Sequence, residues 1–346
     1  MEDTSHTNKK QRVEDGQGEK NVKRKVALLL AYNGVLYQGL QKNPDATTVE
    51  ETLETAIHRA GGISDENFGT LQKISWSRAG RTDKGVHAVG QIIGLKMLLQ
   101  PEPMMDRINS ELEGTGIRVL GFERVINSFC AHTMCESREY QYVLPVYALR
   151  RAAVAVDETG ERLGDSAGAE ARRREEGLTA EERARLLSYL QQLEGTHYFH
   201  NFTDHKLTCK DKQAQRYLLS ARVVDVPPLN GTACVSLCYH GQSFLLHQIR
   251  KMTSVVVGCM RGDLPPDALG VALSTPSLRS GIPLAPACAL TLRRCFFPRY
   301  EKWYGERGSI HFERCAAAQV RARWWRVVLR RFSLPLTLSS RPTPPA

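Results

Sequence analysis

The stretch from Lys25 to Tyr32, KVALLLAY, is a nearly continuous apolar run that stops at the turn pair Asn33-Gly34. A short apolar run that ends at such a turn predicts a buried strand. We therefore expect this chain to build its first half around a β-sheet.

Helix and strand patterns alternate through the rest of the first half. Thr48-Val49-Glu50-Glu51 is a capping box that begins a helix, and Gly61-Gly62 ends that helix. Strands are predicted at residues 73–76, 88–97, 117–122 and 140–146. Two of them flank the charged loop from Arg78 to His87, so the first half is expected to fold around this loop.

The second half repeats the alternation. Thr179-Ala180-Glu181-Glu182 is a second capping box, followed by leucines at helical spacing. Strands are predicted at 218–226 and 234–240, and a long amphipathic helix at 243–260, before Gly262. The chain is therefore predicted to be α+β, with two α/β sandwiches side by side.

The length of 346 residues suits two domains of ordinary size. We predict a disordered tail at 1–23, an N-terminal α/β domain at 24–156 and a C-terminal α/β domain at 179–312. Residues 157–178 carry mixed charge and almost nothing to bury, which predicts an exposed insert. Residues 313–346 form a basic tail that either binds RNA backbone or is poorly ordered.

The charge gives only weak support for a nucleic-acid partner. The formal net charge is +10, but without the seven arginines from Arg314 onward it falls to +3. Nine cysteines with no Cys-x-x-Cys pair predict free thiols in a reducing compartment and no structural zinc. No apolar run is long enough to cross a membrane, so no membrane partner is expected.

The beginning of the chain lacks the pattern of a signal peptide. The basic clusters Lys9–Arg12 and Lys23–Lys25 could direct the chain to the nucleus, or could be solvated tail. We expect the nucleus, with the mitochondrion as the alternative. The sequence indicates no oligomeric state.

The densest polar constellation is the segment Arg78-Ala79-Gly80-Arg81-Thr82-Asp83-Lys84-Gly85-Val86-His87. A carboxylate held ionised beside arginine suits a nucleophile. The same residues could equally form a plain hairpin turn, because Asp-x-Gly is common in turns. The spacing of a nucleotide-binding phosphate loop is missing, which excludes that interpretation.

Four segments in order resemble the TruA family of tRNA pseudouridine synthases, with a likeness that runs from about residue 23 to 300. They are Tyr37-Gln38-Gly39-Leu40-Gln41, the stretch from Gly80 to Gln91, Phe129 with Ser137–Tyr142, and Phe244–Met252. Residues 195–203 and Arg216-Tyr217 resemble the eukaryotic multisite branch of the family. The resemblance implies two ferredoxin-like or RRM-like sandwiches that form one catalytic cleft.

The resemblance also implies roles for residues. Asp83 corresponds to the nucleophile, Tyr140 to the active-site tyrosine and Arg250 to the arginine that pairs with the nucleophile. The residues expected to contact the substrate are Arg81, which corresponds to the arginine that replaces the flipped base, together with His87 and Leu246. The family detaches, rotates and rejoins the uracil through C5, and a carboxylate can open and close the same site without metal or cofactor.

Structural interpretations stand beside these roles. Tyr140 on a strand could simply pack, and Arg250 in a helix could be a solvated charge. His197 and His200 could suggest a metal pair, but a convincing third and fourth ligand is missing. Cys234 and Cys238 share one strand face and are expected to be small buried side chains.

The predicted function is isomerisation of uridine to pseudouridine in tRNA, with other structured RNAs as further candidates. One alternative is the paralogue that modifies the anticodon stem-loop. Another is a catalytically inactive RNA-binding protein or RNA chaperone on the same fold, and a third is a single-strand-binding module.

Overall fold

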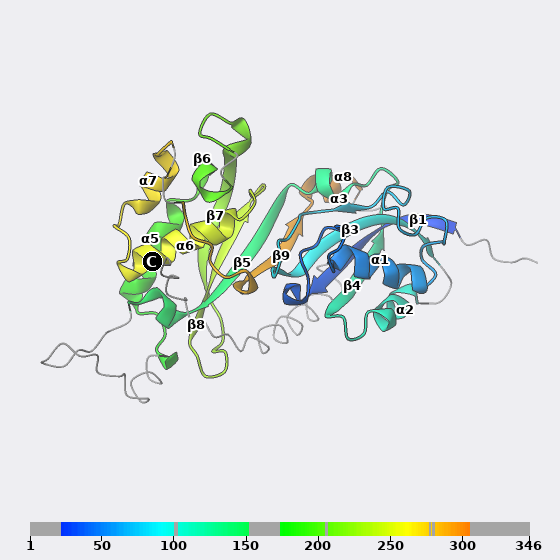
Figure 1. Ribbon diagram of the computed structural model, residues 1–346, viewed down its shortest axis with the longest axis horizontal. Helices are drawn as coiled ribbons and strands as arrows, with labels where there is room; N and C mark the ends of the chain where they lie inside the picture. Colours follow the sequence, from blue (N-terminus) through cyan, green and yellow to red (C-terminus); the bar gives the residue numbers. More distant parts are fainter. Residues whose placement is uncertain are drawn as a thin grey trace, which may run out of the picture.

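The computed structural model describes residues 22–99, 103–151, 174–204, 207–276, 278 and 281–304. A nine-stranded sheet runs through them in the order β4-β1-β3-β9-β5-β8-β7-β6, with β2 paired to β3. The sheet extends along the long axis of the molecule (Figure 1). Its strands are β1 (Val22–Tyr32), β2 (Ser77–Arg78), β3 (His87–Leu99), β4 (Ile117–Arg124), β5 (Ser137–Pro145), β6 (Gly195–Tyr198), β7 (Gln215–Asp225), β8 (Cys234–Gly241) and β9 (Leu290–Phe296).

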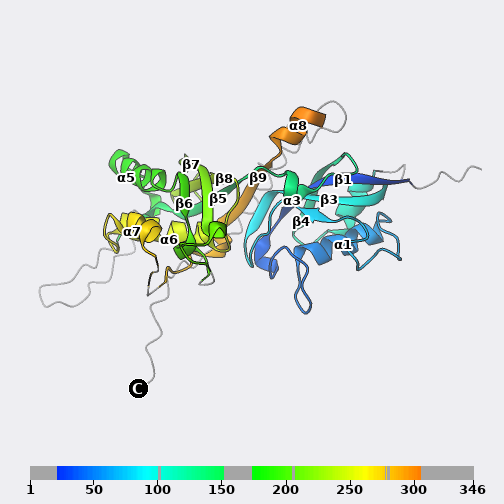
Figure 2. The same ribbon diagram turned by 90° about the horizontal axis from the view of Figure 1, so that it is seen from above.

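Helices cover both faces of this sheet. In Figure 2, α1, α6 and α7 lie on one face and α8 projects from the other. The helices are α1 (Val49–Arg59), α2 (Met104–Glu111), α3 (Ala131–Met134), α5 (Ala180–Gln191), α6 (Gln248–Arg261), α7 (Ala268–Ser274) and α8 (Pro298–Tyr304). Short 3₁₀ turns are η1 (Gly34–Leu36), η2 (Val146–Leu149), η3 (His200–Phe202), η4 (Lys212–Ala214) and η5 (Ala287–Ala289). The predicted α+β class is confirmed.

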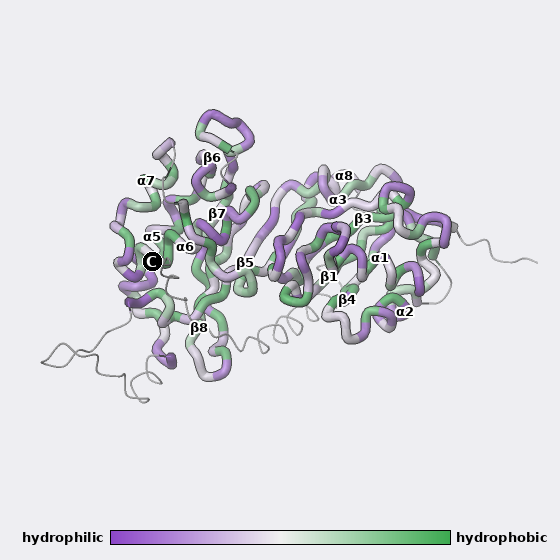
Figure 3. Tube along the Cα trace, in the orientation of Figure 1, coloured by the Kyte–Doolittle hydropathy of each residue, from purple (hydrophilic) through white to green (hydrophobic). Residues whose placement is uncertain are grey.

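Strand β1 is apolar on both faces because both faces are buried. Val26, Leu28 and Leu30 belong to the larger hydrophobic core, under α1 and α2. Ala27 and Leu29 belong to a smaller core on the opposite face, under α8. A strand covered on both sides has no position for a polar side chain, which accounts for the continuous run. Hydrophobic residues follow much of β8, whereas the first half of β5 is hydrophilic (Figure 3).

The two predicted helix starts are confirmed. The Thr48 hydroxyl accepts a hydrogen bond from the backbone N–H of Glu51 at the start of α1. Thr179 and Glu182 form a complete capping box at the start of α5. These caps satisfy backbone donors that have no partner within the helix.

Two predicted elements were wrong in their bounds. The helix expected from Ser243 begins at Gln248, because His247 has a φ of 63° and the left-handed conformation cannot continue a helix. The strand expected at 73–76 is replaced by successive turns, in which the N–H of Ser75 donates to Gln72 O. The paired residues are instead Ser77 and Arg78.

The segments between and outside the predicted domains are only partly described. The tail at 1–21, residues 157–173 of the insert and residues 305–346 lie outside the described residues. The domain bounds therefore stay predictions. Strand β5, which belongs to the predicted first domain, pairs with β8 and β9. No helix in the described ranges is long and apolar enough to span a membrane.

Candidate active site

A pocket of about 760 Å³ lies where residues 76–83, the start of β5 and residues 243–250 meet. We call it the central pocket. Five of the six predicted site residues line it: Asp83, Arg81, Tyr140, Arg250 and Leu246. They come from three segments that are far apart in the sequence, so the fold brings together what the motifs only indicated separately.

The loop that carries Asp83 is fixed from both sides. Gln91 on β3 donates its side-chain amide to Gly80 O at 2.7 Å, and the Thr82 hydroxyl lies 2.8 Å from Tyr32 Oη. Thr82 O accepts the N–H of Leu40 at 3.1 Å. These bonds connect the loop to β1 and to the segment after η1. The hairpin-turn interpretation is also correct locally, because Asp83 O accepts the N–H of Val86.

The Asp83 carboxylate faces the start of α6. Its Oδ2 lies 3.8 Å from Nε2 of His247, and the backbone N–H of His247 donates to the carboxylate. His247 adopts a left-handed backbone conformation, which is uncommon for a residue with a side chain. This turn directs both the N–H and the ring of His247 toward Asp83. No local sequence pattern predicts this geometry, because the amphipathic pattern places His247 inside a helix.

The electrostatics of Asp83 differ from the expectation of a simple arginine pair. Burial raises the pKa of the Asp83 carboxyl, while the charges of His247 and Arg250 and the His247 N–H lower it, leaving the pKa above its ordinary value. A desolvated carboxylate is more basic and more nucleophilic than a solvated one. The neighbouring cations favour its ionised form, so the site combines reactivity with charge.

Arg250 lies in the pocket but makes a different bond from the predicted one. Its Nε donates to Ala285 O at 2.6 Å, and the side-chain nitrogen close to Asp83 Oδ2 is Nε2 of His247, which makes an ion pair when the ring is protonated. Arg250 is still near enough to lower the pKa of Asp83. Arg250 lies within the first turn of α6. Its hydrogen bond to Ala285 O orients the guanidinium, which still lines the central pocket.

Tyr140 lies at the pocket wall on β5. Its side chain is buried, and its ring packs edge-on against Phe244 at 5.3 Å between centroids. Burial strongly raises the pKa of the Tyr140 hydroxyl, so this group is protonated at neutral pH. Its hydroxyl has no hydrogen-bond partner among the described residues, and a Cβ on Gly80 would lie 3.6 Å from it. Tyr140 therefore packs and also presents a free proton donor.

Arg81 and Leu246 are both exposed and both line the pocket, Arg81 from the Asp83 loop and Leu246 from the turn before α6. The side chain of Leu246 is 48% exposed, which is unusual for a leucine beside a polar pocket. Both side chains are available to a ligand that enters the pocket.

His87 does not belong to the central pocket. It is 2% exposed at the start of β3, and its Nδ1 accepts the N–H of Gly34 at 3.2 Å. Burial lowers the pKa of His87 to about 4, so the ring is neutral at physiological pH. His87 is therefore buried outside the central pocket, and its contact with the substrate stays a prediction.

Arg138 is a site residue to which sequence reasoning assigned no role. Its Nε and Nη2 donate to Ala79 O at 3.1 and 2.6 Å, and its Nη1 donates to Gln242 O at 2.6 Å. One buried guanidinium thus joins the segment before Asp83 to the segment before α6. Its place two residues before Tyr140, on the same strand face, was the available signal.

The other candidate ligands take structural positions. His197 Nε2 lies 2.7 Å from Glu194 O, and His200 Nε2 lies 2.9 Å from Thr275 O. Cys238 is buried as predicted, whereas Cys234 is only half-buried. No cluster of three or more potential metal ligands occurs within the described ranges.

Comparison with known proteins finds relatives along most of the chain. Residues 190–298 match the family model described as tRNA pseudouridine synthase. A Yarrowia lipolytica protein named tRNA pseudouridine synthase 1 is 33% identical, covering 84% of this chain and 67% of its own length. A Mus musculus protein named pseudouridylate synthase 1 homolog is 36% identical, covering 89% of this chain and 69% of its own length. The Saccharomyces cerevisiae protein named tRNA pseudouridine synthase 1 is 32% identical, covering 81% of this chain and 62% of its own length.

Proposed function

Because the chain belongs to the tRNA pseudouridine synthase family, we propose that it isomerises uridines in tRNA to pseudouridine, with Asp83 as the nucleophile. The observation that carries this assignment is the environment of Asp83. Its carboxylate is desolvated, lies 3.8 Å from the His247 ring, and shares a pocket with Tyr140 and Arg250. Other structured RNAs are further candidate substrates.

The reaction needs no co-reactant. Asp83 attacks the target uridine, the N1–C1′ glycosidic bond breaks, and the uracil rotates while it stays in the pocket. A C5–C1′ bond then forms, the proton leaves C5, and N1 holds a proton in the product. Atoms and electrons balance within the nucleotide, and Asp83 is released unchanged.

The proton transfers and the charge of Asp83 fall to two neighbours. The ring of Tyr140 is suited to contact the base, and its hydroxyl is suited to assist proton transfer. The positive charge of Arg250 lowers the pKa of Asp83, which favours the nucleophilic form. Its contact is electrostatic at a distance, through a guanidinium oriented by Ala285 O.

Access to a stacked uridine requires that the base be flipped out of its helix. Arg81, exposed beside the pocket, has a planar side chain that can replace lost stacking and bind phosphate. Leu246 on the facing wall can contact the displaced base with its exposed apolar side chain.

Two wider features complete the proposal. The two halves act as two α/β units that share one cleft, which is supported by the central pocket lying where segments of both halves meet. We propose a nuclear location on the strength of the basic cluster Lys9–Arg12. A fluorescent fusion, with and without substitution of that cluster, tests the location, and a mitochondrial signal would contradict it.

The decisive experiment is pseudouridine mapping on unmodified tRNA transcripts incubated with the wild-type protein or with Asp83→Asn. Pseudouridine made only by the wild type is the expected result, and the map names the target positions. Sites confined to the anticodon stem-loop would support the paralogue. If the wild type binds tRNA but modifies no transcript, the chain is an RNA-binding protein and the enzymatic proposal is wrong.

A further inference from the structure

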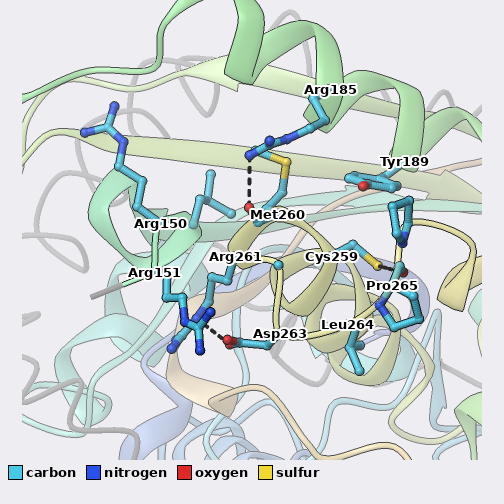
Figure 4. A pocket seen from close by; sticks show the side chains of 13 residues that line it. Arg150, Arg151, Arg185, Tyr189, Cys259, Met260, Arg261, Asp263, Leu264 and Pro265 are labelled. Carbon is cyan, nitrogen blue, oxygen red and sulfur yellow. Dashed lines mark hydrogen bonds and ion pairs between the residues drawn. The ribbon is translucent and has the colours of Figure 1, made fainter. Parts of the chain in front are cut away.

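A second pocket, of about 640 Å³, lies at the opposite end of α6 from the central pocket. Four arginines line it: Arg150, Arg151, Arg185 and Arg261. We call it the arginine pocket. Asp263 is the one carboxylate among its lining residues. In Figure 4, Arg185 approaches from α5, Arg150 lies to one side, and Arg151 and Arg261 lie across from Arg185 with Asp263.

The floor of the pocket is rigid. Leu149, Tyr189, Cys259 and Met260 are each at most 6% exposed and belong to the larger hydrophobic core. They come from η2, α5 and α6, so three elements fix the relative positions of the arginines. A packed floor of this kind holds the charged groups above it at defined positions.

Two of the arginines are already neutralised. Arg150 makes a bidentate contact with Glu182 at 2.7 and 2.8 Å, and its Nη1 lies 2.9 Å from Glu176. Arg261 Nε lies 2.7 Å from Asp263 Oδ2. These two side chains shape the pocket and contribute little net charge.

Arg185 is different. Its Nη2 donates to Met260 O at 2.9 Å, at the C-terminal end of α6, and no carboxylate of the described residues pairs with it. This bond orients the guanidinium while leaving its charge uncompensated. Arg151, exposed at the end of η2, also lines the pocket. Through Arg185 the pocket therefore offers positive charge in a fork-shaped group, which is the geometry that suits a phosphate.

We propose that the arginine pocket binds a phosphodiester of the substrate RNA, remote from the nucleotide that is modified. This inference rests on the proposed function, because it takes RNA as the ligand of the central pocket. Helix α6 connects the two sites, since its first turn lines the central pocket and its last turn lines the arginine pocket. At about 1.5 Å per residue its 14 residues span about 21 Å.

That distance sets what the contact can do. It corresponds to several stacked base pairs of an A-form stem, so one RNA stem can reach both sites. A phosphate contact positions an RNA without selecting its sequence. The arginine pocket would therefore increase the affinity for intact tRNA and orient it, without taking part in the chemistry.

The test measures the affinity of full-length protein for unmodified tRNA by filter binding at several salt concentrations. Arg185→Gln is expected to raise Kd about fivefold, and the double variant that also carries Arg151→Gln is expected to raise Kd more than fivefold. Each lost contact lowers the salt slope by about 0.7–0.9. Asp263→Asn, which removes a negative charge from the same pocket, is expected to lower Kd. Two changes of opposite sign cannot both arise from partial unfolding.

Controls separate this proposal from the proposed function. Arg118→Gln removes an exposed arginine on edge strand β4 and is expected to leave Kd within twofold of the wild type. Single-turnover pseudouridine formation at saturating tRNA is expected to be unchanged by Arg118→Gln, which shows that the control variant is folded. If the wild-type enzyme is active but the double variant keeps the wild-type Kd and salt slope, the proposal that the arginine pocket binds RNA is wrong, while the proposed function stands. Absence of pseudouridine with the wild type would overturn the function and leave the binding comparison valid.

Discussion

Replacement of Arg138 by methionine tests whether one side chain holds the active site together. Methionine keeps much of the length of the side chain and removes its three hydrogen bonds to Ala79 O and Gln242 O. Ala79 is fully buried, so its carbonyl would lose its partner without gaining water. Gln242 is exposed, so its carbonyl can be hydrated.

The expected cost follows from these two environments. An unsatisfied buried carbonyl costs about 1–3 kcal/mol, and a lost bond to a charged donor about 1.5–3 kcal/mol. Removal of a buried charge offsets part of this sum. We expect the free energy of unfolding to fall by about 2–4 kcal/mol. The segment before Asp83 and the segment before α6 would also separate, and a displacement of about 1 Å can lower kcat about a hundredfold.

Urea denaturation gives the stability, and single-turnover pseudouridine formation at saturating tRNA gives the rate in conditions where the variant is folded. Arg118→Met, at an exposed position, is the matched control and should change neither quantity. Arg138→Lys should recover part of the stability, because an ammonium can reach one carbonyl but not both. If Arg138→Met unfolds within about 0.5 kcal/mol of the wild type and keeps its rate, the bridging role is refuted.

Three further predictions concern Asp83, His247 and β1. Burial raises the pKa of Asp83 in the folded state, so ionisation of Asp83 lowers the stability as pH rises through that pKa. Asp83→Asn should therefore be inactive but more stable than the wild type near pH 7, and this difference in stability should shrink in acid. Thermal melts that show no such pH-dependent gain in stability would contradict this. His247→Asn keeps the left-handed conformation but loses the ring that lowers the pKa of Asp83, so the acid limb of the kcat/KM profile should move to higher pH. His58→Asn, at a half-buried histidine on α1 outside the central pocket, should leave that limb in place. Leu29→Ala removes a side chain that is 2% exposed in the smaller core and should cost about 2–5 kcal/mol in urea unfolding; a loss below 1 kcal/mol would show that this face of β1 is not tightly packed.

Local patterns in the sequence determined much of the fold. The caps at Thr48 and Thr179 and the stop at Gly262 were predicted at their observed positions, because each depends on residues within one element. The strand predicted from Lys25 ends at Tyr32 as expected, but β1 begins three residues earlier, at Val22. Motif resemblance likewise identified Asp83, Tyr140 and Arg250 as neighbours, and the structure brings all three into the central pocket.

Tertiary structure decided the rest, because the remaining features depend on contacts between distant segments. The left-handed turn at His247 depends on packing against the Asp83 loop, and no local pattern predicts it. His87 is adjacent to the loop in sequence but is buried behind it, since it begins β3. Arg138 spans two carbonyls that are 59 and 104 residues away in the chain.

The arginine pocket also depends on contacts between segments that are distant in the sequence. Its members lie between positions 150 and 261, on η2, α5 and α6, and none belongs to a motif. Sequence determines which residues carry charge and which are apolar. Only the packing of α5 and η2 against the last turn of α6 determines which charges lie close together, since long-range packing is set by the whole core.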